Sequence, residues 1–147
     1  MNRNYWMLVG TPENWEIMGK NGFNLCAMKA RRKNYASRVR RGDKVVFYLT
    51  KIQAFAGAAQ FLSTYSEDHL PLFVSEKPKE DYPWRFKIKP EVMLDESKAV
   101  PAESLKDKLK YLKKWPPKYW KLGFQGNVHV IGEEDYKTIK STLEKAK

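Results

Sequence analysis

Apolar residues along this chain gather in runs whose lengths and spacing are typical of β-strands. Residues 5–9 (YWMLV) form a continuous apolar run that ends at Gly10, which predicts a strand. Residues 44–50 are rich in β-branched and aromatic side chains, and residues 54–64 follow after a short connection, so we predict an antiparallel hairpin. Gly57, inside the second of these strands, indicates a bulge or a close approach by another backbone.

Three further segments have mixed patterns. Residues 85–89 alternate, with Phe86 and Ile88 on one face and three basic side chains on the other, which predicts a half-buried strand with a basic face. Residues 127–131 predict a last short strand. The apolar residues 23–28 fit either an extended segment or a turn.

Helix signals occur at the start of the chain and between the strands. Thr11 is a candidate N-cap, followed by Pro12 at the first helical position, which is the order that begins many helices. Residues 34–40 predict a short helix that ends at Gly42. The strands therefore alternate irregularly with helices.

The C-terminal third predicts two more helices. Pro101 begins one whose apolar stripe consists of Leu105, Leu109 and Leu112, at the spacing of one helix face. The last begins with three acidic residues at 133–135, which complement the positive end of a helix. Strands clustered in the middle with helices around them indicate an α+β fold with a mixed, curled sheet or partial barrel.

Composition bounds the class of protein. The 147 residues fit one domain over residues 1–147, and 42% hydrophobic with 14% aromatic residues suffices for a core. No run approaches the roughly 18–20 apolar residues of a membrane span, and the first residues lack the apolar stretch of a signal peptide. The single cysteine, Cys26, excludes a disulfide framework and a multi-cysteine zinc site. We expect a soluble, cytoplasmic protein without membrane contact.

The positive charge is concentrated in two segments. Residues 29–44 carry a net +7 and residues 106–121 a net +6, which leaves −2 for the rest of a chain whose total is +11. Aromatic residues are interleaved with the cations in both. Cations beside flat side chains suit a polyanion, because phosphates release counterions and bases stack. The alternative is that the lysines only form a solvated surface.

Catalytic and cofactor motifs are missing from the sequence. It has two histidines, His69 and His129, and neither a metal-ligand spacing nor a phosphate-binding glycine loop. Cys26 in an apolar run is typical of a small core residue. We therefore predict neither an enzyme nor a cofactor nor a metal site. An enzyme acting on RNA would need Cys26 or His129 inside a pocket.

The middle of the chain holds the groups that recognise a nucleobase, namely flat platforms, a base-edge group and cations. Asn24 offers a donor and an acceptor for a base edge, although a turn residue bonding its own backbone is the alternative. The aromatic candidates could equally belong to the core. The predicted base pocket comprises Trp15, Asn24, Leu25, Tyr48 and Trp84, and the predicted phosphate contacts comprise Lys29, Arg31, Arg32, Arg38 and Arg85.

An ordered set of short motifs in this chain resembles the EVE domain. The set comprises 5–9 (YWMLV), 11–15 (TPENW), 22–25 (GFNL), 42–48 (GDKVVFY), Gly57 and 82–90 (YPWRFKIKP), and the resemblance covers about residues 4–143. It implies a PUA-like fold, in which a mixed β-sheet or pseudobarrel is flanked by helices, and a relationship to YTH domains.

The resemblance also implies a non-enzymatic module that takes a modified base of RNA or DNA into a pocket. Where YTH relatives place a cage tryptophan, this chain has Asn24, which favours a pocket with a polar side chain and fewer rings. We expect a monomer whose partner is nucleic acid. The alternative is a small-molecule or protein-interaction domain with a lysine-rich, solubilising surface.

Overall fold

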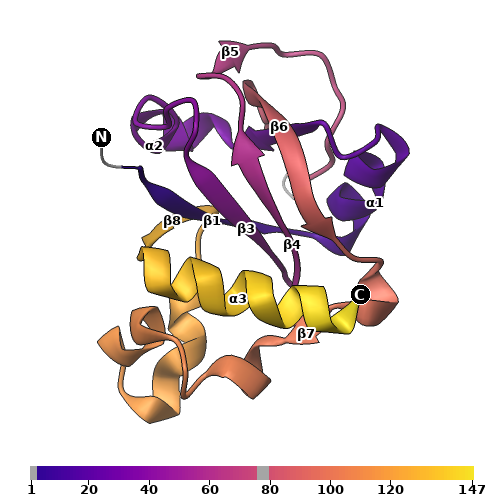
Figure 1. Cartoon of the computed structure of the whole chain (residues 1–147). Helices are drawn as coiled ribbons and strands as arrows, with labels where there is room; N and C mark the ends of the chain where they lie inside the picture. The colour runs from indigo at the N-terminus through magenta and orange to yellow at the C-terminus, as the bar shows by residue number, and fades with distance from the viewer. Residues whose placement is uncertain (1–2, 76–79) are drawn as a thin grey trace.

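A curled, mixed sheet lies at the centre of the fold (Figure 1). The computed structural model describes residues 3–75 and 80–147. Its strands are β1 (Tyr5–Gly10), β2 (Leu25–Met28), β3 (Lys44–Leu49), β4 (Ala54–Phe61), β5 (Ser66–Glu67), β6 (Trp84–Met93), β7 (Val100–Pro101) and β8 (Val128–Ile131). The order is β2-β6-β4-β3-β1-β8, with β5 on β6 and β7 on β4. β1 runs parallel to β3, and the other described pairs are antiparallel.

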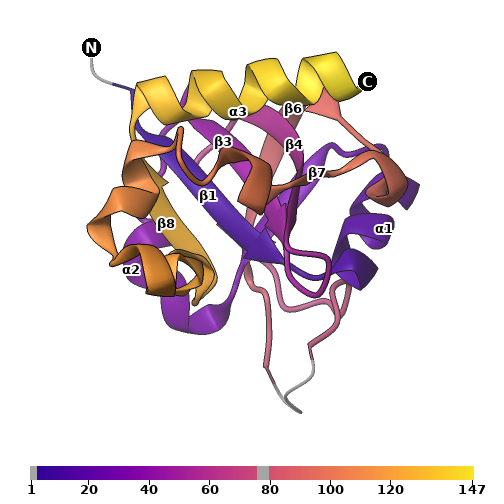
Figure 2. The same cartoon turned by 90° about the horizontal axis from the view of Figure 1, so that it is seen from below.

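Helices cover both faces of this sheet. The α-helices are α1 (Pro12–Lys20), α2 (Lys33–Ala36) and α3 (Glu133–Ala146), and the 3-10 helices are η1 (Ala30–Arg32), η2 (Glu96–Lys98), η3 (Ala102–Leu105), η4 (Lys110–Lys114) and η5 (Pro117–Phe124). In Figure 2, α3 crosses the sheet, and the orange η4–η5 segment, which precedes it in the chain, lies on the same side. The α+β architecture and the predicted hairpin of β3 and β4 are confirmed.

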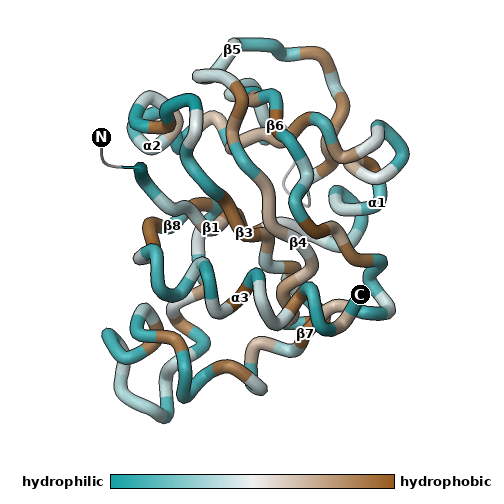
Figure 3. Tube along the Cα trace, in the orientation of Figure 1, coloured by the Kyte–Doolittle hydropathy of each residue, from teal (hydrophilic) through white to brown (hydrophobic). Residues whose placement is uncertain are grey.

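Both faces of the central strands are buried. In β1, Met7 and Val9 pack into the core under α3, whereas Trp6 and Leu8 pack into the core shared with α1 and β2. When both faces of a strand are buried, apolar residues do not alternate with polar ones along it. This explains the continuous apolar run of β1. Figure 3 shows hydrophobic residues along β3 and β4 through the centre of the molecule.

The predicted helix after Pro101 is wrong. This stretch forms the separate 3-10 helices η3 and η4, and Leu109 between them is extended. Its three leucines are nevertheless buried in the core under α3. Residues 34–40 likewise form little more than the single turn of α2.

Gly57 marks a close approach, as predicted, although side chains rather than backbone approach it. A Cβ atom here would lie 2.5 Å from Cη2 of Trp15 and 2.6 Å from Sδ of Met93. The register of β3 and β4 also shifts beside this glycine, between Phe47 and Tyr48. A bulge and a close contact therefore coincide.

The basic face predicted for residues 85–89 is wrong at Arg85. Lys87 and Lys89 are exposed, but the Arg85 side chain is 6% exposed. Its Nε donates to the carbonyl oxygen of Tyr82 at 3.1 Å, and Nη2 donates to the carbonyl oxygen of Leu70. Alternation places a residue on a face, but it does not reveal a loop that covers part of that face.

Candidate functional site

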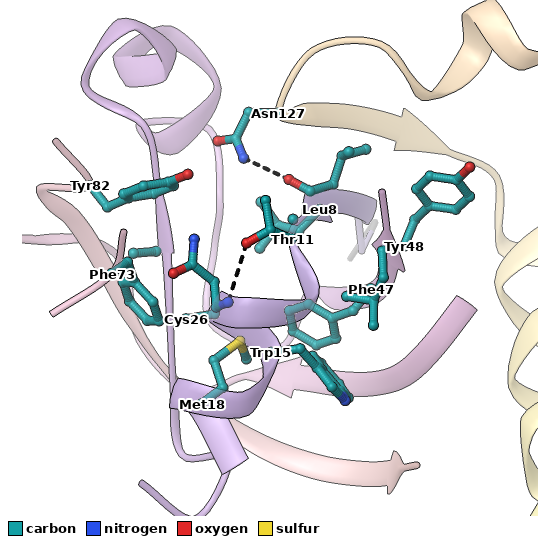
Figure 4. Close-up of a pocket in the computed structure, with 15 residues that line it drawn as sticks. Leu8, Thr11, Trp15, Met18, Cys26, Phe47, Tyr48, Phe73, Tyr82 and Asn127 are labelled. Carbon is teal, nitrogen blue, oxygen red and sulfur yellow. Dashed lines mark hydrogen bonds between the residues drawn. The ribbon is translucent and has the colours of Figure 1, made fainter. Parts of the chain in front are cut away.

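A small cavity lies beside the end of β1, between α1, β2, β3 and the loop before β6 (Figure 4). Its volume is about 40 Å³, which is room for a few water molecules. Most of the lining side chains are apolar. The lining includes Thr11, Asn14, Cys26, Phe73, Tyr82 and Asn127.

The first turn of α1 supplies the polar wall of the cavity. Oγ1 of Thr11 caps the helix by accepting from the backbone N–H of Asn14 at 3.2 Å. Asn14 is only 7% exposed. Its Nδ2 donates to the carbonyl oxygen of Val74 at 2.9 Å, and its Oδ1 accepts from the N–H of Val74 at 2.8 Å. The amide thus clamps the loop that covers the cavity.

Two aromatic rings from this loop close the cavity. The rings of Phe73 and Tyr82 meet edge to face, with centroids 5.8 Å apart. Buried Arg85 holds the loop through its bonds to the carbonyls of Leu70 and Tyr82 and through an ion pair with Asp68 at 3.4 Å. Arg85 therefore positions the loop, and we do not assign it a phosphate contact.

The opposite wall comes from β2 and from the residue before β8. Cys26 is buried, and this burial raises the pKa of its thiol, which keeps the sulfur protonated and disfavours nucleophilic catalysis. Oδ1 of Asn127 accepts from the N–H of Lys29 at 3.0 Å, and Nδ2 donates to the carbonyl oxygen of Val9 at 3.0 Å. Asn127 therefore joins the cavity to the first basic segment.

The first basic segment borders the cavity at Lys29. The Nζ of this residue lies 5.9 Å from the centroid of the Tyr82 ring. Glu80 partly neutralises it, at 3.1 Å from Lys29 and 3.8 Å from Arg31. Arg38 is exposed, with its guanidinium carbon 5.8 Å from the Tyr35 ring centroid. Within residues 3–75 and 80–147, neither Arg32 nor Arg38 has an ion-pair partner.

Two of the five predicted pocket residues line the cavity, and neither offers a free ring. Trp15 packs against Phe47 with centroids 5.3 Å apart, and its Nε1 donates to the carbonyl oxygen of Leu94. Tyr48 stacks on Phe124 with centroids 4.0 Å apart and planes 4° apart. Figure 4 shows its ring turned away from the other labelled residues. Both rings belong to the core.

The other three lie outside the cavity lining. Asn24 is exposed in the turn after α1, where its carbonyl oxygen accepts from the N–H of Ile88 at 3.1 Å. Leu25 lies next to it at the start of β2. Trp84 is buried, and its Nε1 donates to the carbonyl oxygen of Ala30 at 2.9 Å.

Sequence reasoning therefore missed most of the polar and aromatic groups at the cavity. Asn14 had one available signal, namely a polar residue in a first helical turn that directly follows a buried strand. Phe73 and Tyr82 come from an irregular stretch with no periodicity, and only the fold brings them to β1. Within the described part of the chain, no cluster of residues suits a metal ion, and no helix is long and apolar enough to cross a membrane.

Comparison with known proteins places the chain among described families and folds. The EVE domain model matches residues 4–142. A UPF0310 protein of Pyrococcus abyssi is 32% identical over 148 residues, which cover 95% of this chain and 99% of that protein. The Mmi1 YTH domain, solved in complex with RNA, superposes with a TM-score of 0.68 at 11% sequence identity. The match covers 99% of this chain and 80% of the Mmi1 chain. A YTH domain from Zygosaccharomyces rouxii, solved with N6-methyladenosine RNA, has a TM-score of 0.64 at 16% sequence identity. That match covers 97% of this chain and 88% of the YTH chain.

Proposed function

Because this chain belongs to the EVE domain family, we propose that it is a nucleic-acid-binding module that takes one unpaired base into the cavity beside α1. One observation carries the proposal: a buried amide and two aromatic rings line a cavity that borders the first basic segment. Two proteins of similar fold were solved with RNA, one of them with methylated adenosine. They support nucleic acid as the ligand class.

Base uptake requires the cavity to open. Its present volume, about 40 Å³, is far below the roughly 300–1,000 Å³ typical of ligand pockets. Asn14 now uses one N–H and its side-chain oxygen in hydrogen bonds to Val74. A base edge also presents donors and acceptors, so it can replace Val74 on the same amide. Phe73 and Tyr82 are then the rings against which the base stacks.

The basic segments supply the backbone contacts. Lys29 lies beside the Tyr82 ring of the cavity, Arg31 lies beside Glu80, and Arg32 and Arg38 follow in the same segment. Arginine suits this role because its planar fork of donors matches phosphate oxygens. These contacts hold any sequence, whereas the cavity distinguishes one base from another.

Fluorescence anisotropy with short single-stranded RNA and DNA tests the proposal. The oligonucleotides are plain or carry one methylated or hydroxymethylated base, and each is titrated at two salt concentrations. We expect one base to bind tightest. Asn14→Ala should weaken that complex about ten-fold, because a hydrogen-bonding partner is lost, without changing the salt dependence. Asn24→Ala is the matched control and should bind like the wild type.

Two results would count against this function. If Asn14→Ala lowers the affinity for every oligonucleotide equally, the cavity does not read a base, and only a basic surface binds nucleic acid. If no oligonucleotide binds at moderate salt, the small-molecule or protein-interaction alternative is favoured.

A further inference from the structure

The two basic segments, far apart in the sequence, meet beside β8. A Cβ atom at Gly126 would lie 2.8 Å from Nη2 of Arg32 and 3.8 Å from Cε1 of His129, so the guanidinium and the imidazole pack over one glycine. From the second segment, the Tyr111 ring lies 5.9 Å from the His129 ring, and Lys114 places its Nζ 5.0 Å from the Tyr111 centroid. In Figure 2, α2, β8 and the orange η4–η5 segment share one side of the molecule.

Hydrogen-bonding capacity at this meeting point is unused. Nε of Arg32 and Nε2 of His129 are buried atoms without a hydrogen-bond partner in the structure as described. Buried polar atoms are rarely left unpaired in proteins. A ligand that accepts hydrogen bonds would satisfy Nε of Arg32, and it would satisfy Nε2 of His129 once the ring is protonated.

The charge at this point is also unbalanced. Burial lowers the pKa of His129, and the positive charges of Arg32 and Lys114 lower it further, against an opposing hydrogen bond to the backbone of Gln125. No ion pair joins Arg32 or Lys114 to any residue in 3–75 or 80–147. Two cations therefore act on the buried His129 ring, and no ion pair in the described residues balances either of them, a setting that favours an anion.

We propose that Arg32, Lys114 and His129 form a phosphate subsite on the path of the nucleic-acid backbone. The inference rests on the proposed function and adds His129 and Lys114 to it. The position of the subsite supports it, because Asn127, which lines the base cavity and bonds Lys29, directly precedes β8 and lies only two residues before His129. A strand with one base in the cavity can thus continue over Lys29 to Arg32 and then to Lys114.

The phosphate is expected to bind with uptake of a proton. The hydrogen bond to Gln125 engages one ring nitrogen of His129, and Nε2 is the nitrogen left without a partner. Protonated Nε2 donates to a phosphate oxygen, and the anion offsets the repulsion from Arg32 and Lys114. Phosphate should therefore raise the pKa of His129, and binding should tighten as the pH falls.

NMR titration of the two histidine rings in the full chain tests the subsite with inorganic phosphate and, separately, with a short single-stranded RNA. We expect phosphate to raise the midpoint of His129 by about one pH unit and to leave that of His69 unmoved. His69 is the internal control because its partners are Glu67 and Asp81.

Three substitutions extend the test to backbone binding, measured by anisotropy. Arg32→Gln and Lys114→Gln should each weaken RNA binding about ten-fold and lower the slope of log affinity against log salt by about 0.7. Lys145→Gln changes the net charge equally at an exposed position near the end of α3, and it should leave the slope unchanged. Lys114 is exposed, so its variant is expected to fold.

The outcomes separate the two proposals. A His129 shift with phosphate in a protein that binds no oligonucleotide supports the subsite and contradicts the proposed function. The subsite is overturned, and the proposed function stands, if the protein binds RNA but two things stay unchanged. These are the titration midpoint of His129 and the salt slopes of Arg32→Gln and Lys114→Gln.

Discussion

At the scale of single residues, buried polar groups fix parts of the structure that apolar packing leaves open. Asp43 is 2% exposed and accepts three hydrogen bonds, from the N–H groups of Asn4 and Arg40 at 3.0 Å and from Nε1 of Trp6 at 2.9 Å. It thereby joins the start of β1 to the end of the first basic segment. Asn14, Arg85 and Asn127 act similarly around the cavity, where each bonds a segment distant in sequence.

A methyl group at Gly57 should destabilise the protein. The Cβ of Gly57→Ala would overlap the Trp15 ring and the Met93 sulfur, and both are packed in or against the core. Overpacking of this kind costs about 1–3 kcal/mol, which thermal and urea unfolding would detect. Gly10→Ala is the control, because nothing lies within 4 Å of its Cβ position. Equal stability of the two variants would contradict a tight contact at Gly57.

At the scale of elements, strands were predicted better than helices. Strand signals are local, since β-branched and aromatic runs such as that of β3 need no distant partner to be recognised. The segment after Pro101 differs, because Asp135 at the start of α3 accepts from the N–H groups of Lys110 and Tyr111 at 2.9 and 2.7 Å. This distant carboxylate fixes the start of η4, and the leucine spacing gave no indication of it.

Removal of that carboxylate should loosen η4. Asp135→Ala leaves two peptide N–H groups without acceptors, and each such loss costs about 1–3 kcal/mol when buried. We expect a lower midpoint of urea unfolding and a red shift of tryptophan fluorescence, since Trp115 follows η4 directly. Glu134→Ala, an exposed neighbour, should change stability by less than about 0.5 kcal/mol. A blue-shifted or unchanged spectrum for Asp135→Ala would contradict this role.

At the scale of the whole molecule, the fold class followed from the sequence and the site did not. The order of strands and helices, with a resemblance over nearly the whole chain, sufficed for the curled α+β sheet. The cavity is instead assembled from β1, α1, β2, β3, the loop before β6 and the residue before β8. The predicted rings of Tyr48 and Trp84 have the right chemistry but are enclosed by the two cores. The two basic segments were visible in the sequence, but their proximity beside β8 was not.

The net charge of +11, concentrated in segments that converge, should make stability depend on salt. Raising NaCl from about 10 to 200 mM shortens the Debye length from about 30 Å to below 10 Å, so repulsion within the folded state weakens. We expect the Tm to rise, as differential scanning calorimetry would measure. Phosphate at equal ionic strength should raise it further if the subsite binds. A Tm that falls with NaCl would show that attractive pairs dominate instead.

The place of β1 in the sheet has a consequence for biosynthesis. β1 pairs with β8, Tyr5 opposite Ile131, so β1 can pair along this edge only after β8 has been made. At about 5–20 residues per second, this edge of the nascent sheet stays open for on the order of ten seconds. The unpaired N–H and C=O groups of this edge are then available to chaperones or to another nascent chain. Folding of this sheet should therefore finish only after β8 has left the ribosome.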